Sequence, residues 1–198
     1  MLERFHVSDD EAIRINHKKM HNVVSQIFMK MGVSESDSKL SADVLIYADL
    51  NGVDTHGVSN MLRSYVKNYQ QKKINPTPKI KIKNETSATL SLDGDSGLGI
   101  VTAPKAMKMA IEKAKEAGVG IATLNNAGHL GAAGFHAKMA VDEDMIGVCM
   151  SGGADLPGFQ LMGQNQDLVR ILLPGQRQQI KRLTLCLMQQ LLKLLATK

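Results

Sequence analysis

The chain has 198 residues, enough for one domain with a substantial core or for two small domains. Its hydrophobic content of 43% and charged content of 22% are ordinary for a globular protein. No stretch reaches the roughly eighteen apolar residues of a membrane span, and no basic start leads into a long apolar run. The two cysteines give neither a disulfide framework nor a metal-ligand spacing. We therefore expect a cytoplasmic protein without a membrane partner or a bound metal.

The net charge of +5 is confined to one end of the chain. Residues 160–198 contain six basic residues and one acidic residue, so residues 1–159 are neutral overall. Proteins that bind nucleic acids usually carry a basic stripe or patch on a folded domain. Because residues 1–159 lack one, we expect no nucleic-acid partner.

The first seventy-five residues predict a helical region. Ser8 and Glu11 have the spacing of a capping box and open a helix that ends near Gly32. Ser34 with Asp37 predicts the start of a second helix. A third amphipathic helix precedes the Asn-Pro-Thr-Pro run that begins at residue 75. Its apolar positions are Met61, Leu62, Tyr65, Val66 and Tyr69.

The next segments predict a hairpin followed by a turn. Residues 79–83 alternate lysine and isoleucine, which is typical of a half-exposed strand with lysines guarding an edge. Residues 88–92 predict a second strand, paired with the first across residues 84–86. Residues 93–97 predict a tight turn.

Strands and helices then alternate along the chain. A long helix through residues 103–114 is closed by Gly118, and residues 119–124 predict a buried strand. A helix over 132–141 and a strand over 145–150 follow. We therefore predict an α/β fold, with an N-terminal helical cap and an incomplete, non-Rossmann domain of alternating strands and helices.

Two histidines stand next to glycines in turns. His56 lies in Asp-Thr-His-Gly, and His129 lies in Asn-Asn-Ala-Gly-His-Leu-Gly. An imidazole titrates near neutral pH, and glycine lets a ligand approach the backbone. Each histidine precedes a predicted helix, whose free N–H groups disfavour the imidazolium form. A neutral imidazole can take a hydroxyl proton as a hydride leaves the same carbon, although both histidines could also be ordinary capping or turn residues.

Other motifs favour structural interpretations. Gly97-x-Gly99 lacks the third glycine of a dinucleotide fingerprint, and the strand that follows does not end at an acidic residue. Asp93-x-Asp95 lacks the later ligands of a calcium loop, so we expect a structural turn at both motifs. His17 and His21 have a metal-ligand spacing but no third ligand nearby, which favours a solvated helix face. His136 is expected to be a packed or surface residue.

The chain resembles the malate/L-lactate dehydrogenase family of NAD(P)-dependent 2-hydroxyacid oxidoreductases. The resemblance is carried by the run from Ala48 to Gly57, by Ile-Asn-Pro at 74–76, by Leu-Asp-Gly-Asp at 92–95 and by the run from Asn126 to Ala133. It implies a non-Rossmann cofactor domain, a homodimer and a small 2-hydroxy acid or 2-keto acid as substrate. NAD and NADP both remain open as the cofactor.

The resemblance also implies site residues. His56 is our first choice for the catalytic acid/base and His129 our second. Many members carry an arginine four residues after the first histidine, suited to binding a carboxylate, whereas this chain has Asn60 there. Arg63 is our substitute candidate, so the predicted substrate-binding set is Asp54, Asn60 and Arg63. The predicted cofactor-binding residues are Gly128, Ser151, Gly152 and Gly153.

The resemblance ends near Phe159. Family members continue with a Leu-Gly-Thr-Asn-Pro-Ile-Ala segment that contributes to the cofactor site. The codons of that segment, read one nucleotide late, can encode residues 168–174 of this chain. Our hypothesis is therefore that residues from about 160 onward are out of frame, which predicts a truncated and inactive enzyme. The alternative is a native tail, in which residues 178–195 form a leucine-rich basic helix on a membrane or a partner.

The expected organisation is a helical region at 1–75, a partial α/β substrate and cofactor domain at 76–159 and an out-of-frame tail at 160–198. Two functions stay open. The first is an oxidoreductase that transfers a hydride between a nicotinamide cofactor and a small 2-hydroxy acid. The second is a non-catalytic dimerisation or interaction protein derived from such an enzyme.

Overall fold

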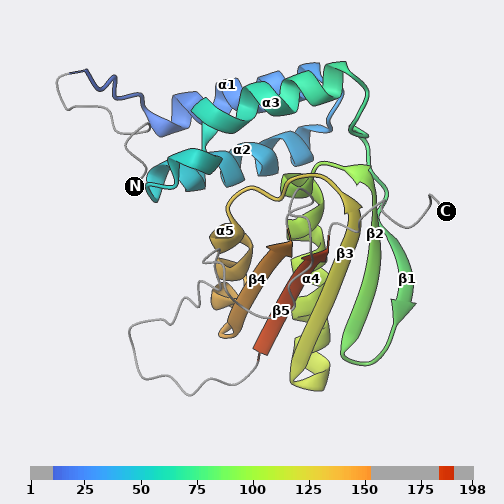
Figure 1. The fold of residues 1–198 in the computed structure, drawn as a ribbon. Coiled ribbons are helices and arrows are strands. Elements are labelled where there is room, and N and C mark those ends of the chain that lie inside the picture. Colours follow the sequence, from blue (N-terminus) through green and yellow to red (C-terminus); the bar gives the residue numbers. More distant parts are fainter. Residues whose placement is uncertain (1–10, 153–182, 190–198) are drawn as a thin grey trace. The chain divides into compact units, whose positions relative to one another are not determined.

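The computed structural model describes residues 11–152 and 183–189. The chain divides into two compact units, Met1–Thr77 and Pro78–Lys198, and each unit is described by itself. The elements of both are labelled in Figure 1. Helices followed by a partly parallel sheet confirm the predicted α/β class.

The first unit contains the three predicted helices, α1 (His17–Lys30), α2 (Glu35–Leu50) and α3 (Val58–Gln70). The predicted start of the first helix is wrong. Ser8 lies outside the described residues, and the helix begins at His17, where the Asn16 side chain accepts hydrogen bonds from the backbone N–H groups of Lys18 and Lys19. An asparagine beside the first turn satisfies N–H groups that have no partner within the helix.

The second cap is confirmed. The Ser34 hydroxyl accepts a hydrogen bond from the Asp37 N–H at 3.2 Å, and α2 starts at the next residue. The aromatic rings of Phe28 and Tyr69 meet edge to face, with their centroids 6.3 Å apart, and join α1 to α3. The buried apolar side chains of this unit include Val24, Phe28, Val44, Leu45 and Tyr65.

The second unit is built on a five-stranded sheet in the order β1-β2-β3-β5-β4. The strands are β1 (Lys81–Glu85), β2 (Thr89–Gly97), β3 (Val119–Ala127), β4 (Ile146–Gly152) and β5 (Leu183–Gln189). The predicted hairpin is confirmed, because β1 pairs antiparallel with β2. β1 also lies at the edge of the sheet, as its lysines indicated, but all five of its residues are exposed, so the prediction of a half-exposed strand is wrong. The other pairings are parallel.

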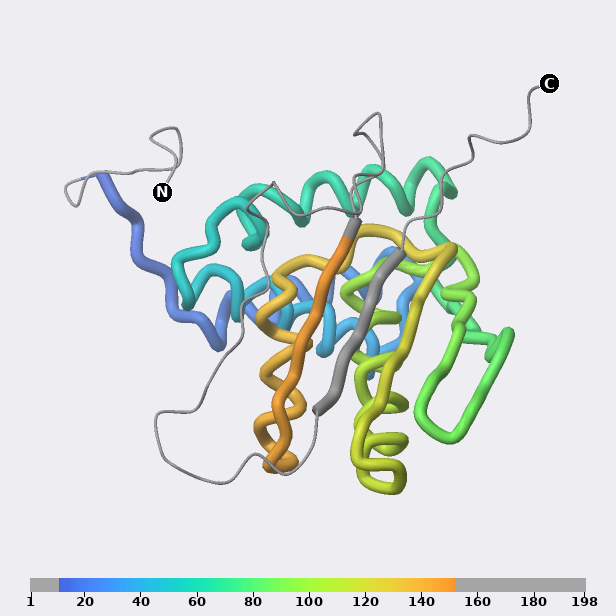
Figure 2. The backbone as a smooth tube through the Cα atoms, turned by 60° about the horizontal axis from the view of Figure 1, so that its bottom comes forward, coloured from blue at the N-terminus to red at the C-terminus, as the bar shows by residue number. Residues whose placement is uncertain are grey.

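Two helices pack on the sheet. Figure 2 shows α4 (Gly99–Ala117) and α5 (Ala133–Lys138) on the same face of its strands. Gly118 ends α4 in the left-handed conformation with φ +81°, as predicted. The backbone of α4 at Ala110 occupies the space that a side chain at Gly120 would need, so helix and strand approach closely. The core between them includes Leu92, Met107, Ala110 and Leu124.

Two further predictions are wrong in detail. Residues 93–97 do not form a separate tight turn, because β2 continues to Gly97 with a register shift between Asp93 and Gly97. The helix predicted for a native tail is also wrong where the tail is described. Residues 183–189 form strand β5, which lies between β3 and β4. Among the described residues, no helix is long and apolar enough to cross a membrane.

Candidate functional site

His56 ends a short 3-10 helix, η2 (Asp54–His56), in the first unit. Its backbone N–H bonds the Val53 carbonyl at 2.9 Å, and its Nδ1 lies 2.7 Å from the Thr55 hydroxyl. A hydroxyl can donate or accept, so this contact is compatible with either neutral tautomer of the ring. The side chain is half-buried, which holds the imidazole while leaving part of it accessible.

Asp49 supports the turn from the end of α2. Its carboxylate accepts a hydrogen bond from the Val58 N–H at 3.0 Å and so caps α3 from nine residues away. The same carboxylate occupies the space that a side chain at Gly57 would need. Burial raises the pKa of Asp49, the Val58 hydrogen bond opposes this, and the charge of Asp54 adds to it. One of the N–H groups that we expected to be free at the start of this helix, that of Val58, is therefore bonded to a carboxylate.

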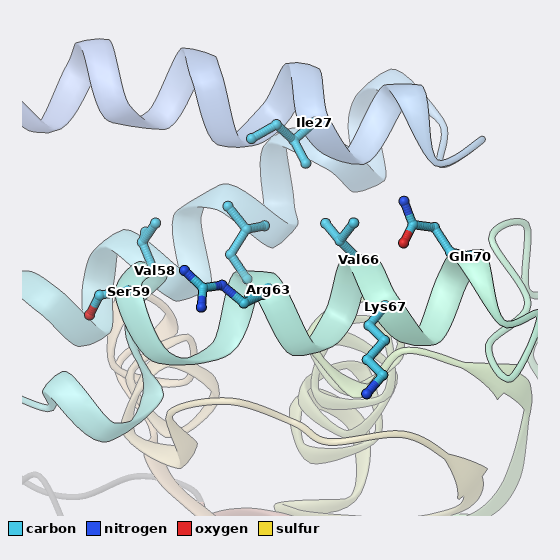
Figure 3. A pocket seen from close by; sticks show the side chains of 8 residues that line it. Ile27, Val58, Ser59, Arg63, Val66, Lys67 and Gln70 are labelled. Atoms are coloured by element: carbon cyan, nitrogen blue, oxygen red, sulfur yellow. The ribbon is translucent and has the colours of Figure 1, made fainter.

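Asn60 and Arg63 lie on α3 and face different surroundings. The Asn60 side-chain amide donates to the Asp54 carbonyl at 2.6 Å, so it braces the turn that carries His56. Arg63 is exposed and lines a hollow of about 620 Å³ between α1 and α3 (Figure 3). Neither Asp54 nor His56 lines this hollow. The first unit thus brings Asp54, His56 and Asn60 together and places Arg63 on a neighbouring surface.

His129 belongs to the second unit, in the loop from β3 to α5. The loop is tied to the end of β2, because the Gly128 N–H bonds the Gly97 carbonyl at 2.8 Å. The His129 Nδ1 accepts a hydrogen bond from the Gly131 N–H at 3.2 Å. α5 has only six residues, so the dipole of this helix acts weakly on the ring. The ring is half-buried.

Glycines interlock this loop with the start of α4. A side chain at Gly99 would collide with the Gly128 carbonyl and would come within 2.6 Å of the His129 backbone. A side chain at Gly97 would meet Pro78 and Thr102. Packing therefore accounts for both glycines, which supports the structural interpretation of the Gly97-x-Gly99 motif.

The carboxylates of Asp93 and Asp95 are bound by protein donors. Asp93 accepts from the Asp95 N–H, from the Asn126 amide and from Lys83, which lower its pKa to about 2. Asp95 accepts from the Lys79 N–H at 3.1 Å. The Asn126 bond joins β2 to β3, and the Lys83 contact joins β2 to β1, which supports a structural role for this motif. In the part of the chain that the structure describes, no cluster of three or more acidic, histidine or cysteine side chains could hold a metal ion.

His136 is completely buried in α5, so it is packed, one of the two expected alternatives. Its Nε2 lies 2.8 Å from the Leu130 carbonyl. Burial lowers the pKa of His136 to about 4, and the hydrogen bond to Leu130 opposes this shift. His17 is exposed, whereas His21 pairs with Asp43 at 2.9 Å.

The predicted cofactor residues follow two strands of the sheet. Gly128 comes directly after β3, and Ser151 and Gly152 end β4, where Ser151 is exposed. Ligands of open α/β sheets commonly bind at the carboxyl ends of the strands. A side chain at Gly128 would make only ordinary contacts, the nearest at 3.4 Å from Leu98, so packing does not require glycine there. Gly153 lies outside the described residues.

Sequence reasoning missed two supporting residues. Asp49 caps a helix that begins nine residues later, whereas capping signals are sought within four residues of a helix start. His136 contacts Leu130, six residues earlier, and only its complete burial reveals that it supports the His129 loop. Gly57 precedes α3 and has no side chain that could cap the helix. In the sequence, this glycine was the one indication that the cap comes from a distant residue.

Comparisons with known proteins agree with this arrangement. The family model for malate/L-lactate dehydrogenase matches residues 15–156. Malate dehydrogenase from Pyrococcus abyssi is 42% identical over 156 residues, which are 79% of this chain and 42% of that protein. L-sulfolactate dehydrogenase from Methanocaldococcus jannaschii is 43% identical over 136 residues, covering 69% of this chain and 38% of that protein.

A solved structure shows the same fold. Malate dehydrogenase from Pyrococcus horikoshii superposes with a TM-score of 0.68 at 39% sequence identity, over 73% of this chain and 41% of that chain. The chain thus spans about two fifths of the length of these relatives. The family match includes both histidine turns and the strands and helices that support them. The chain belongs to the malate/L-lactate dehydrogenase family.

Proposed function

We propose that this chain is part of an NAD- or NADP-dependent dehydrogenase that oxidises a small 2-hydroxy acid or reduces the corresponding 2-keto acid. The observation that carries the proposal is that the family match at residues 15–156 includes both histidine turns. The half-buried imidazoles with hydrogen-bonded Nδ1 atoms support it. The relatives are named malate dehydrogenase and sulfolactate dehydrogenase, which supports hydroxy acids as the substrate class.

In this proposal, His56 is the acid/base. The Thr55 hydroxyl oxygen can accept a hydrogen bond from the His56 Nδ1–H, which leaves the lone pair on Nε2 free to take the substrate proton and later return it. Asn60 and Asp49 hold the turn at either end. Arg63 is the candidate for binding the substrate carboxylate, because a guanidinium forms two parallel hydrogen bonds with it.

Gly128, Ser151, Gly152 and Gly153 are the proposed cofactor-binding residues. The bare backbone at Gly128, where packing does not demand glycine, leaves room for a ligand to approach. A bound nicotinamide would supply the hydride acceptor for oxidation of the hydroxy acid. We further propose that the functional protein is a homodimer, which light scattering during size-exclusion chromatography measures directly.

We also propose that residues from about 160 onward are out of frame. The family match ends at residue 156, close to where the sequence departs from the family pattern. Strands pair through backbone N–H and C=O groups, which an out-of-frame sequence has as well. The pairing of strand β5 with β3 and β4 is therefore compatible with this proposal. Sequencing the locus tests it. If no single-base change restores a Gly-Thr-Asn-Pro segment, the proposal is wrong.

The test of function compares the purified chain with its frame-restored form. We expect saturable binding of NADH or NADPH by fluorescence titration, and turnover with malate, lactate or a related acid in the restored form. His56→Ala should lower kcat by about 10²- to 10⁴-fold with cofactor affinity nearly unchanged. His17→Ala, at an exposed position of the same unit, is the matched control and should leave both unchanged. Retained turnover in His56→Ala would remove His56 from the mechanism.

A further inference from the structure

His136 and His129 bind the two edges of one peptide group. The carbonyl that contacts the His136 Nε2 belongs to Leu130, and the N–H that donates to the His129 Nδ1 belongs to Gly131. Carbonyl and N–H of these consecutive residues form the same peptide unit, and no described peptide bond is cis. In a trans peptide the two groups point in opposite directions, so each edge holds one imidazole.

The first bond determines the protonation of His136. A carbonyl oxygen can only accept, so the His136 Nε2 must carry a proton and donate it. Its Nδ1 is buried and has no hydrogen-bond partner among the described residues. Complete burial disfavours the charged ring, so His136 is a neutral donor in one tautomer.

The second bond determines the protonation of His129. A backbone N–H can only donate, so the His129 Nδ1 must present its lone pair to Gly131. In the neutral ring the proton then resides on Nε2. Gly131 has φ +74°, a left-handed conformation that favours glycine and that orients this peptide.

We propose that His136 is a positioning residue that, through the Leu130–Gly131 peptide, keeps His129 in the Nε2–H tautomer. The hydrogen bond from His136 polarises the peptide and strengthens the donor at its other edge. Assigning this tautomer a catalytic purpose rests on the proposed function. There, His129 acts through its Nε2–H as a hydrogen-bond donor to a substrate oxygen.

Nuclear magnetic resonance tests this without substrate or turnover. In the full chain labelled with ¹⁵N-histidine, long-range ¹H–¹⁵N correlations at pH 7.5 distinguish protonated from unprotonated ring nitrogens. We expect His129 and His136 each to show protonated Nε2 and unprotonated Nδ1. The His129 signals are assigned by their loss in His129→Gln. A His129 ring protonated at Nδ1 in the unmodified chain would overturn the proposal.

Variants test the role of His136 itself. His136→Leu removes the donor to Leu130, and we expect His129 to become a mixture of tautomers. His136→Gln keeps an N–H donor and should restore the single tautomer, while His17→Ala should leave the His129 signals unchanged. An unchanged His129 spectrum in folded His136→Leu, or no rescue by glutamine, would overturn the proposal. If His136→Leu does not fold by circular dichroism, the tautomer of the unmodified chain decides.

Failure of the tautomer proposal and failure of the proposed function can be distinguished. A failed dehydrogenase assay does not change the ring signals, because they are recorded without substrate or turnover. A failed tautomer test, in turn, leaves His56 as the proposed acid/base, since His56 is held by different contacts.

Discussion

The two histidine turns are held by different kinds of interaction, although both place an imidazole near glycine. The His56 turn depends on side chains, the Asp49 carboxylate at the start of α3 and the Asn60 amide on the Asp54 carbonyl. The His129 loop depends on backbone packing around Gly99 and on the buried ring of His136.

This difference indicates which substitutions should destabilise each turn. The Asp49 carboxylate is partly exposed and the Asn60 amide is exposed, so water can replace the hydrogen bonds that they make. Each of these bonds therefore contributes modestly to the free energy of unfolding. By contrast, the backbone of the His129 loop packs directly against Gly99, so a side chain added at Gly99 could be accommodated only if the loop moved. We therefore expect substitutions around His129 to cost more stability than those around His56, and acid to destabilise the His129 loop as the pH falls from about 6.5 toward 4.

The largest expected effect is that of Gly99→Ala. The added methyl group would meet the Gly128 carbonyl and the His129 backbone, neither of which can rotate away. We expect a loss of about 3 kcal/mol or more in the free energy of unfolding, or failure to fold. Urea denaturation followed by circular dichroism measures it.

Gly128→Ala is the matched control, because a methyl group there makes only ordinary contacts. Its cost should stay below about 1 kcal/mol, while cofactor affinity should fall if Gly128 lies in the binding site. Equal stability losses in the two variants would contradict the interlocked packing.

The second effect is acid destabilisation through His136. Its folded pKa of about 4 lies below the ordinary value of 6.5, so the unfolded state binds the proton more tightly. The stabilising contribution is complete above pH 6.5 and is lost as pH falls toward 4, by an amount on the order of 3 kcal/mol. The free energy of unfolding, measured between pH 4 and 6.5, should change more steeply with pH in the unmodified chain than in His136→Gln. Parallel curves would show that His136 titrates normally.

The third effect concerns Asp49. Asp49→Ala removes the cap of α3 and should cost about 1 kcal/mol, whereas Asp49→Asn keeps an acceptor for the Val58 N–H and should cost less. The folded pKa is raised above 3.8, so the ionised carboxylate is the less favourable form. Stability should therefore decrease as pH rises from 3.8 through the raised pKa, and this decrease should be absent in Asp49→Asn. An alanine variant as stable as the asparagine variant would exclude the cap.

The smallest effect is expected for Asn60→Ala. It removes one exposed hydrogen bond to the Asp54 carbonyl, so we expect a loss of about 0.5 kcal/mol. Ser64→Ala, at another exposed position of α3, controls for the helix preference of alanine. In the frame-restored protein, Asn60→Ala should also lower turnover more than Ser64→Ala. Equal turnover would mean that Asn60 does not position the His56 turn.

Sequence by itself determined the features that depend on neighbouring residues. Ser34 caps α2, Gly118 ends α4, and the lysines of 79–83 mark an edge strand, each through contacts or conformations within a few residues. The family motifs around His56 and His129 are likewise contiguous, so they could be recognised without a structure. Such signals have short range because they arise from backbone geometry and adjacent side chains.

Tertiary structure decided the contacts that join distant residues. Asp49 reaches the start of α3 across nine residues, and β5 lies between β3 and β4 although it follows both in the chain. The burial of His136 depends on how α5 packs on the sheet. No periodic pattern reports these pairings, because their energy comes from packing and desolvation that exist only once the chain has folded.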